Sequence, residues 1–257
     1  IANPQTGWGR SDETWNALNM IEQLGGPTWF RLGDADIGLH LERSRRLAEG
    51  EPLSQVCRDI CVSLGITVQV LPMSDDRVPT WVSTAEGELP FQEYFVLRRC
   101  QPEVAGFRFE NAGQAHSAPG VTEAIGEADL VVICPSNPWV SIDPILSIPG
   151  IREAVAGRMT VAVSPIIGGR ALKGPAAKMY AELGIDPSAV SDARHYNGLI
   201  GRIVIDNLDV GLAGEIKALG IQPLVTDTVM KTRADRRRLA KKVLESGGMA
   251  ARSPGDE

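Results

Sequence analysis

Short apolar segments alternate with helical segments from Pro119 almost to the end of the chain, and this alternation limits the fold more than any other feature. Residues 130–134 and 159–163 are almost entirely apolar, which is typical of strands buried on both faces of a sheet. Two more strands are expected at 203–206 and 221–225. Helices are expected to begin near Pro119, Pro149, Pro175, Val210 and Asp235. The series predicts an α/β fold in which helices cover both faces of a mainly parallel sheet.

The first 118 residues follow a different pattern, in which helices precede short β-branched and aromatic stretches. Helices are expected before Gly25, capped by Ser11 or Asp12, then at 38–48, and from Pro52 onwards. Strands of a partly exposed sheet are expected at 66–70, 80–82, 91–96 and 107–109. We therefore predict three regions: an inserted helical and β region at 1–118, a Rossmann-like nucleotide-binding region at 119–245, and a flexible tail at 246–257.

The composition narrows the range of partners. The chain has 26 Lys and Arg against 32 Asp and Glu, so its net charge of −6 provides no global positive field for nucleic acid or an anionic membrane. No apolar run approaches the roughly 20 residues of a membrane helix, and no secretory leader is visible, so we expect a cytoplasmic protein. Cys57 and Cys61 share one helical face with apolar neighbours, where buried thiols are expected rather than metal ligands.

Two loops follow the predicted buried strands and carry polar side chains. In an open parallel sheet, ligands bind at the carboxyl ends of the strands, because loops and helix N-termini present free N–H groups there. One loop, 135–138, projects Ser136 and Asn137 between two prolines. The other begins at Ser164, and its residues Gly168, Gly169 and Lys173 suit an anion. A cap and a tight turn with solvated cations explain the second loop equally simply.

Three further groups have both a structural and a functional interpretation. Asp75 and Asp76 end a predicted strand and could bind magnesium, although capping a turn is the commoner role. Asp34 and His40 could act in catalysis or make structural hydrogen bonds. Trp8 lies between two glycines, where its ring could stack on a flat heterocycle or simply pack against the protein.

Eight sequence strings occur in the same order in 2-phospho-L-lactate transferases, so the chain resembles this family from Ile1 to about Leu244. They are Gly7-Trp8-Gly9, Trp29-Phe30-Arg31-Leu32-Gly33-Asp34, Leu71-Pro72-Met73-Ser74-Asp75-Asp76, Phe91-Gln92-Glu93-Tyr94-Phe95, Pro135-Ser136-Asn137-Pro138 with Ser141-Ile142, Ser164-Pro165-Ile166-Ile167-Gly168-Gly169, Lys173-Gly174-Pro175-Ala176 and Arg194-His195-Tyr196. A collinear set of this kind is specific.

The resemblance implies a Rossmann-like domain, assembly as a homodimer and a magnesium-dependent reaction. Members of the family transfer a phospholactate-type group from a guanosine diphosphate-activated donor to the ribityl hydroxyl of the deazaflavin Fo, and they release GMP. This is a step of coenzyme F-420 biosynthesis. The transferred acid is 2-phospholactate, a phosphoenolpyruvate-derived group or phosphoglycerate.

The resemblance also implies roles for individual residues. The nucleotide and its phosphates are expected to contact Ser136, Asn137, Ser164, Gly168, Gly169 and Lys173. The deazaflavin is expected near Trp8, Gly9 and Arg31, and Asp34 and His40 are expected to be catalytic. Positioning of the two substrates matters more than any covalent intermediate in such a phosphoryl transfer.

The chain departs from the family pattern at its start and at three later positions. Because Ile1 replaces the expected methionine, we expect that the natural beginning is missing, and with it the glycine-rich turn and the acidic segments that supply magnesium ligands. The family has Arg in place of Ala35 and Ala-Thr in place of Gly38-Leu39, which allows a different donor or acceptor preference.

Two alternatives to the transferase remain. One is a nucleotide-sugar-binding regulator that resembles gluconeogenesis-factor proteins, which share the fold without known phospholactate transfer. The other is a dinucleotide-binding dehydrogenase, which is disfavoured because no G-x-G-x-x-G fingerprint is present.

Overall fold

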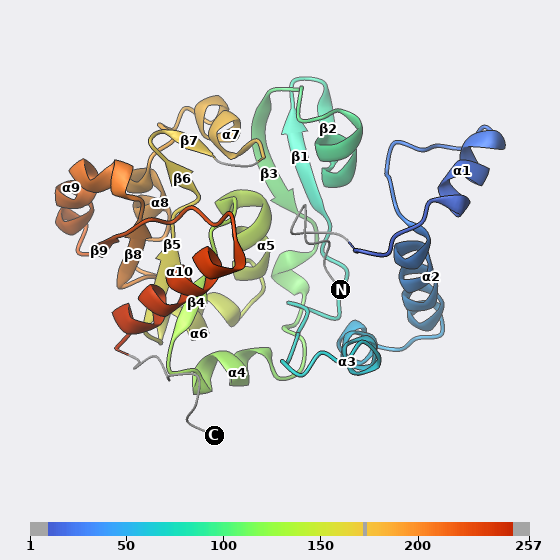
Figure 1. The fold of residues 1–257 in the computed structure, drawn as a ribbon, viewed down its shortest axis with the longest axis horizontal. Helices are drawn as coiled ribbons and strands as arrows, with labels where there is room; N and C mark the ends of the chain where they lie inside the picture. Colours follow the sequence, from blue (N-terminus) through green and yellow to red (C-terminus); the bar gives the residue numbers. More distant parts are fainter. Residues whose placement is uncertain (1–9, 172–173, 249–257) are drawn as a thin grey trace.

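A four-stranded parallel sheet forms the core of the C-terminal half of the computed structural model, which describes residues 10–171 and 174–248 (Figure 1). Its strands, in spatial order, are β4 (Val131–Ile133), β5 (Thr160–Val163), β8 (Arg202–Ile205) and β9 (Gln222–Val225). The register places Val132 opposite Val161, Ala162 opposite Ile203, and Val204 opposite Leu224. The predicted α/β fold with a mainly parallel sheet is confirmed, and all four predicted strands lie within one residue of their expected bounds.

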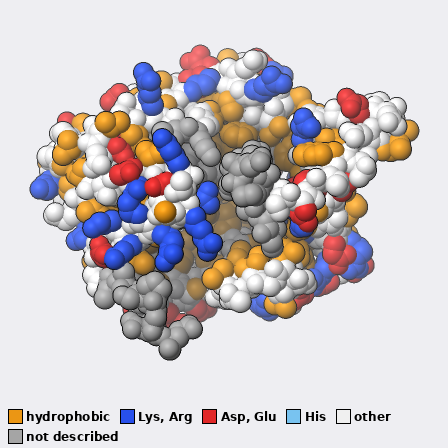
Figure 2. Space-filling model, viewed as in Figure 1, with side chains coloured by type: hydrophobic (Ala, Val, Ile, Leu, Met, Phe, Trp, Pro, Cys, Tyr) orange, Lys and Arg blue, Asp and Glu red, His pale blue; other side chains and the backbone are white. Residues whose placement is uncertain are grey.

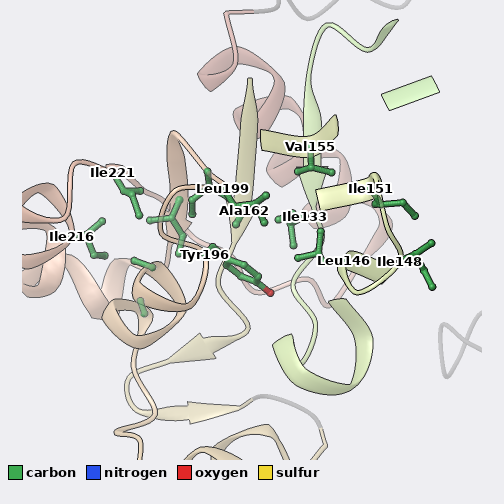
Figure 3. Packing of buried hydrophobic residues seen from close by; sticks show 14 of the residues in the cluster. Ile133, Leu146, Ile148, Ile151, Val155, Ala162, Tyr196, Leu199, Ile216 and Ile221 are labelled. Carbon is green, nitrogen blue, oxygen red and sulfur yellow. The ribbon is translucent and has the colours of Figure 1, made fainter. Parts of the chain in front are cut away.

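Alternate residues of these strands point to two different cores, because side chains in a strand alternate between the faces of a sheet. Ile133, Ala162 and Ile203 belong to the larger core, which Ile151 and Ile216 of neighbouring helices complete (Figure 3). The smaller core, on the other face, contains Val161, Val163, Val204, Leu239 and Val243. Burial of each such side chain contributes about 1.5–3 kcal/mol.

Helices cover both faces, as predicted. The larger core is covered by α4 (Val121–Glu127), α6 (Ile151–Ala156), α8 (Ala189–His195) and α9 (Ala213–Ala218), and the smaller core by α10 (Arg233–Ser246). Shorter elements connect them: η2 (Ala112–Gln114), η3 (Pro138–Ile142), α5 (Asp143–Leu146), β6 (Ile166–Ile167), β7 (Arg170–Ala171), α7 (Ala176–Glu182) and η4 (Asn207–Leu212). The predicted starts at Pro119, Pro149 and Pro175 are confirmed, since α4, α6 and α7 begin within two residues of them.

A second, antiparallel sheet lies beside the first, with the order β2 (Gly87–Pro90), β1 (Thr80–Thr84) and β3 (Val104–Phe109). The strands predicted at 80–82 and 107–109 are therefore confirmed, whereas β2 was not expected. Val82 and Val104 are buried together with Tyr94 in a core of their own.

The strand predicted at 91–96 is wrong, because residues 91–97 are helical and include the π-helical turn η1 (Glu93–Leu97). Phe91 and Phe95 stack with their ring centroids 5.3 Å apart, which is the contact that helical i, i+4 spacing produces. Tyr94 on the same turn is fully buried. Burial of Tyr94 and stacking of Phe91 on Phe95 in a helical turn outweigh the strand preference of the sequence.

The strand predicted at 66–70 is also wrong. The segment is exposed, with 69% of Val68 and 48% of Val70 accessible to solvent, and among the described residues it pairs with no strand. β-branched side chains favour an extended backbone, but a strand requires a hydrogen-bonding neighbour as well.

Three helices precede the small sheet: α1 (Asn16–Gln23), α2 (Asp34–Ala48) and α3 (Leu53–Ser63) (Figure 1). The expectation that Ser11 or Asp12 caps the first helix is wrong. Instead, the Asp34 carboxylate accepts hydrogen bonds from the backbone N–H groups of Asn16 and Ala17, at 3.1 and 2.8 Å. Glu13, which lies just before α1, accepts in turn from the N–H of Ala35 in the first turn of α2, at 3.1 Å. The start of each helix is therefore capped by a side chain from the start of the other helix.

The expected burial of Cys57 and Cys61 is only partly met. Both side chains are partly exposed, and their neighbour Val56 is the fully buried residue of this face. A helix that could cross a membrane is not found among the residues that the structure describes.

Candidate active site

An open cleft of about 620 Å³ lies at the carboxyl ends of β4 and β5. Its apolar wall includes the rings of Phe30, Phe91 and Phe95 together with Val140, and its polar side chains are Gln92, Ser136, Asn137 and Ser141. We call it the aromatic cleft. Its volume falls in the range of pockets that hold small organic ligands, and its apolar walls with a few polar groups are typical of them.

The walls of the aromatic cleft come from distant parts of the chain. Phe91 and Phe95 are presented by the helical segment that follows β2, while Ser136 and Asn137 follow β4. Asn137 accepts a hydrogen bond from the backbone N–H of Trp139 at 3.0 Å, and Pro138 occupies the first position of η3. The Asn137 carbonyl oxygen is therefore engaged by the protein.

A second cleft of about 280 Å³ adjoins the first and shares Pro135 and Pro165 with it. Its remaining lining residues are Ser164, Ile167, Thr228, Met230 and Arg236. We call it the Arg236 cleft. Because β4, β5 and β9 are parallel, the segments that follow them meet at one edge of the sheet, and this brings Thr228 and Arg236 beside the loop at Ser164.

Ser164 is held by a buried carboxylate. Its hydroxyl donates to Asp192 at 2.5 Å, and the hydroxyl of Tyr180 donates to the other oxygen of the same carboxylate. Asp192 has no solvent-exposed surface, and this burial raises its pKa to about 6 although both hydrogen bonds favour the charged form. The network ties the loop after β5 to α7 and α8.

Thr228 is fixed in the same way by Asp206. Its N–H and hydroxyl donate to one carboxylate oxygen of Asp206, at 2.9 and 3.1 Å. The N–H of Leu208 donates to the other oxygen at 3.0 Å. Asp206 thus joins the ends of β8 and β9 and keeps the floor of the Arg236 cleft in place.

Gly168 and Gly169 form the turn of the β6–β7 hairpin, and both have positive φ angles, 55° and 75°. The N–H of Gly168 donates to both carboxylate oxygens of Asp209, at 3.1 and 3.2 Å. Neither glycine lines the aromatic cleft or the Arg236 cleft. The tight-turn interpretation accounts for these two glycines, and their contact with a nucleotide stays a prediction.

Asp34, Arg31 and His40 lie outside both clefts. Hydrogen bonds from Thr14, Ala17 and Asn16 lower the pKa of Asp34 to about 2, so its carboxylate is occupied as the cap of α1. A general base works best with a pKa closer to neutrality, and the catalytic role of Asp34 stays a prediction.

Arg31 is exposed, with its guanidinium 5.0 Å from the centre of the Trp15 ring. His40 is partly buried on α2. The neighbour of Arg31, Phe30, is the residue of this segment that reaches the aromatic cleft. Trp8, Gly9 and Lys173 lie outside the described residues.

The acidic pair at the end of the 71–76 string has structural partners. Asp75 accepts from the N–H and hydroxyl of Ser54, at 2.6 and 2.9 Å, and so caps α3. Asp76 accepts from the N–H of His116 at 2.9 Å. These contacts support the capping interpretation over a magnesium site.

Sequence reasoning missed several residues of the site, among them Asp192, Thr228 and Arg236. Thr228 lies three positions after the end of a predicted parallel strand, so the rule that selected Ser136 and Ser164 could also have selected it. Asp192 and Arg236 lie on helices and give no local signal of that kind.

Comparison with known proteins identifies the family. The family described as 2-phospho-L-lactate transferase CofD matches residues 13–244 of the chain. The chain belongs to this family. Similar proteins include the phosphoenolpyruvate transferase of Streptomyces griseus, 43% identical over 95% of this chain and 79% of that protein. The 2-phospho-L-lactate transferase of Methanocaldococcus jannaschii is 37% identical over 96% of this chain and 80% of that protein.

A solved structure supports the fold alone. Protein BH3568 of Bacillus halodurans superimposes with a TM-score of 0.59 at 15% sequence identity, over 83% of this chain and 72% of that one. The family and its relatives make the CofD-family chain a transferase of the phospholactate or phosphoenolpyruvate type in coenzyme F-420 biosynthesis.

Proposed function

We propose that the chain transfers a phosphoenolpyruvate-derived, phospholactate or phosphoglycerate group from a guanosine diphosphate-activated donor to the ribityl hydroxyl of the deazaflavin Fo, with release of GMP. The observation that carries the proposal is the pair of adjoining clefts at one edge of the parallel sheet. One is aromatic and suits a flat heterocycle, and the other contains a cation and suits a charged group.

The aromatic cleft supports Fo as the acceptor. A deazaflavin is a flat fused ring system, and stacking on aromatic side chains is a favourable way to hold such a ring. Phe91 and Phe95 offer a stacked pair on one wall, and the hydroxyls of Ser136 and Ser141 are close enough to line the same space. A ribityl chain that extends from the bound ring toward Pro135 and Pro165 would approach the Arg236 cleft, because both clefts share these two prolines.

The Arg236 cleft supports an anionic donor next to that hydroxyl. In the reaction, the hydroxyl oxygen forms a bond to a phosphorus atom of the donor diphosphate, the bond from that phosphorus to the GMP oxygen breaks, and the hydroxyl proton is released. Enzymes accelerate such transfers mainly by alignment and by stabilising the charge on the phosphoryl oxygens. The two adjoining clefts provide the alignment.

The family resemblance implies Mg²⁺ as the cofactor. Within residues 10–171 and 174–248, no three His, Cys, Asp or Glu side chains converge as a metal site would require. The described residues therefore offer no site with three such protein ligands, and we assign no step to an ion. Dependence on added Mg²⁺ belongs to the experiment below.

A homodimer is proposed as well. The 15-residue helix α2 has no buried residue, and α1 has one, Leu18. Large apolar side chains remain accessible on these two helices and directly after α1, among them Met20 at 54%, Leu24 at 78% and Leu41 at 66%. Contact with a second copy would bury this surface, which is otherwise costly to expose.

The proposal is tested by incubating the purified chain with Fo and the activated donors, with and without Mg²⁺. Product is measured by mass spectrometry and GMP by chromatography. We expect the phosphodiester product and GMP to appear in equal amounts, only when both substrates are present. Binding of a nucleotide sugar without any transfer to Fo would instead support the regulator resembling gluconeogenesis factor.

A further inference from the structure

We propose that Arg236 binds an oxyanion of the donor, a phosphate or carboxylate oxygen pair, and is the side chain that sets donor affinity in the Arg236 cleft. The inference rests on the proposed function and adds to it a specific donor contact. It depends on which side-chain hydrogen-bond donors of this cleft are not already bonded to other groups of the protein.

The hydroxyl groups in the cleft have already used their protons. Ser164 donates to Asp192 at 2.5 Å, and Thr228 donates to Asp206 at 3.1 Å. A hydroxyl has one proton, so neither can donate to an anion without abandoning a buried carboxylate. The other lining side chains are Pro135, Pro165, Ile167 and Met230, none of which is a donor. Arg236 is therefore the side-chain donor that the described lining leaves for an anion.

Nearby carboxylates do not neutralise Arg236. Asp227 and Asp235 are the acids close to the start of α10, and both pair with Arg238, at 2.8 Å each. Among the described residues, no carboxylate lies within ion-pair distance of Arg236. Its guanidinium can therefore offer its fork of N–H groups to an incoming oxyanion, in the bidentate geometry that suits phosphate and carboxylate.

The start of the helix is a poor alternative binding site. Thr232 and Asp235 form a capping box, in which Asp235 accepts from the N–H of Thr232 at 2.8 Å. This places the Asp235 carboxylate at the N-terminus of α10, where it would repel an anion. Among the described lining residues, Arg236 is the group that attracts an anion into the cleft.

The surroundings of Arg236 favour an orientation in which its guanidinium faces the cleft. The residue also lines an apolar groove with Val132, Leu239 and Val243. An arginine commonly packs its aliphatic stem on such a surface and presents its charged end to a polar space. Lys and Arg side chains gather over α10 in a protein whose net charge is −6, so the approach to the cleft is locally positive (Figure 2).

The test compares Arg236→Gln with Arg237→Gln, which removes the same charge from the next position. Arg237 is exposed and lines neither cleft. Calorimetry measures the Kd of GDP, which carries the diphosphate but no carboxylate, and steady-state kinetics measure KM for the activated donor and for Fo. A charge-assisted bidentate contact predicts weakening on the order of tenfold or more for Arg236→Gln. Arg236→Lys should recover part of the loss.

The pattern of losses identifies the contacted group. Weaker binding of GDP would place the diphosphate at Arg236, whereas an increased donor KM with normal GDP binding would place the carboxylate of the transferred acid there. Equal effects of the two glutamine variants, or no effect of Arg236→Gln on either ligand, would overturn the inference. If Arg236→Gln weakens GDP binding but the parent chain performs no transfer, the oxyanion site is retained and the transferase proposal is refuted. If the parent chain performs transfer and Arg236→Gln transfers normally, the transferase proposal is retained and the oxyanion site is refuted.

Discussion

Replacement of Asp192 by asparagine removes a buried titratable group but keeps its size and a hydrogen-bond acceptor. In the folded protein, burial raises the pKa of Asp192 from its usual 3.8 to about 6. The folded state therefore holds the proton more tightly than the unfolded chain does. The resulting contribution to stability is fully present below pH 3.8 and is lost as the pH rises through 6.

The size of the effect follows from the shift. A difference of about two pKa units corresponds to about 3 kcal/mol, since each unit is about 1.4 kcal/mol. The asparagine side chain cannot titrate, so the free energy of unfolding of the parent protein minus that of Asp192→Asn should fall by about 3 kcal/mol between about pH 4 and about pH 6. Above that range the difference should be constant.

Urea denaturation of both proteins, followed by tryptophan fluorescence across this pH range, measures the difference directly. Other titrating groups are common to both proteins and cancel in the subtraction. Two unfolding free energies that run parallel from low to neutral pH would refute the reasoning, because they would mean that the pKa of Asp192 is the same in the folded and unfolded states. In that case the hydrogen bonds from Ser164 and Tyr180 would offset the cost of burial.

Three other predictions concern the acceptor wall and the helices before it. Phe91→Ala should raise KM for Fo by about 5- to 150-fold, which corresponds to about 1–3 kcal/mol of lost stacking, while GDP binding is unchanged, and an unchanged KM would remove Phe91 from the acceptor site. Gly33→Ala should increase proteolysis between α1 and α2, because a Cβ there would lie 1.9 Å from Glu13, whereas Gly38→Ala meets no atom within 4 Å and serves as the control. Leu24→Asp should shift the protein toward monomer in sedimentation equilibrium, and an unaffected dimer would place the interface elsewhere.

The sequence predicted the parallel sheet well because the signal is local. Residues 130–134 and 159–163 are apolar on both faces, and prolines mark the starts of α4, α6 and α7. The prediction failed for 91–96, where strand-forming residues are helical because the rings of Phe91 and Phe95 stack at i, i+4 spacing. It failed for 66–70 because a strand depends on a partner that composition does not reveal.

The candidate site was predicted only where residues directly follow a strand. Ser136 and Ser164 were found because topology alone places the ends of parallel strands at one edge. Arg236 is 72 positions from Ser164 along the chain, and only the order of the strands brings it to the same cleft. Asp34 was expected to be catalytic, yet its partners are Thr14, Asn16 and Ala17, which no local pattern associates with it.

The two clefts differ in how firmly their walls are held, and this suits the two substrates. Residues that follow β5 and β9 are fixed by the buried carboxylates of Asp192 and Asp206, so the Ser164 and Thr228 part of the Arg236 cleft is held in place. The aromatic cleft takes one wall from the sheet edge and another from Phe30 and the helical turn at 91–97, which belong to other parts of the chain. A change in the acceptor wall can therefore alter acceptor binding without disturbing the oxyanion site. For this reason Phe91→Ala and Arg236→Gln should act on different substrates, and their effects on transfer should be additive in free energy.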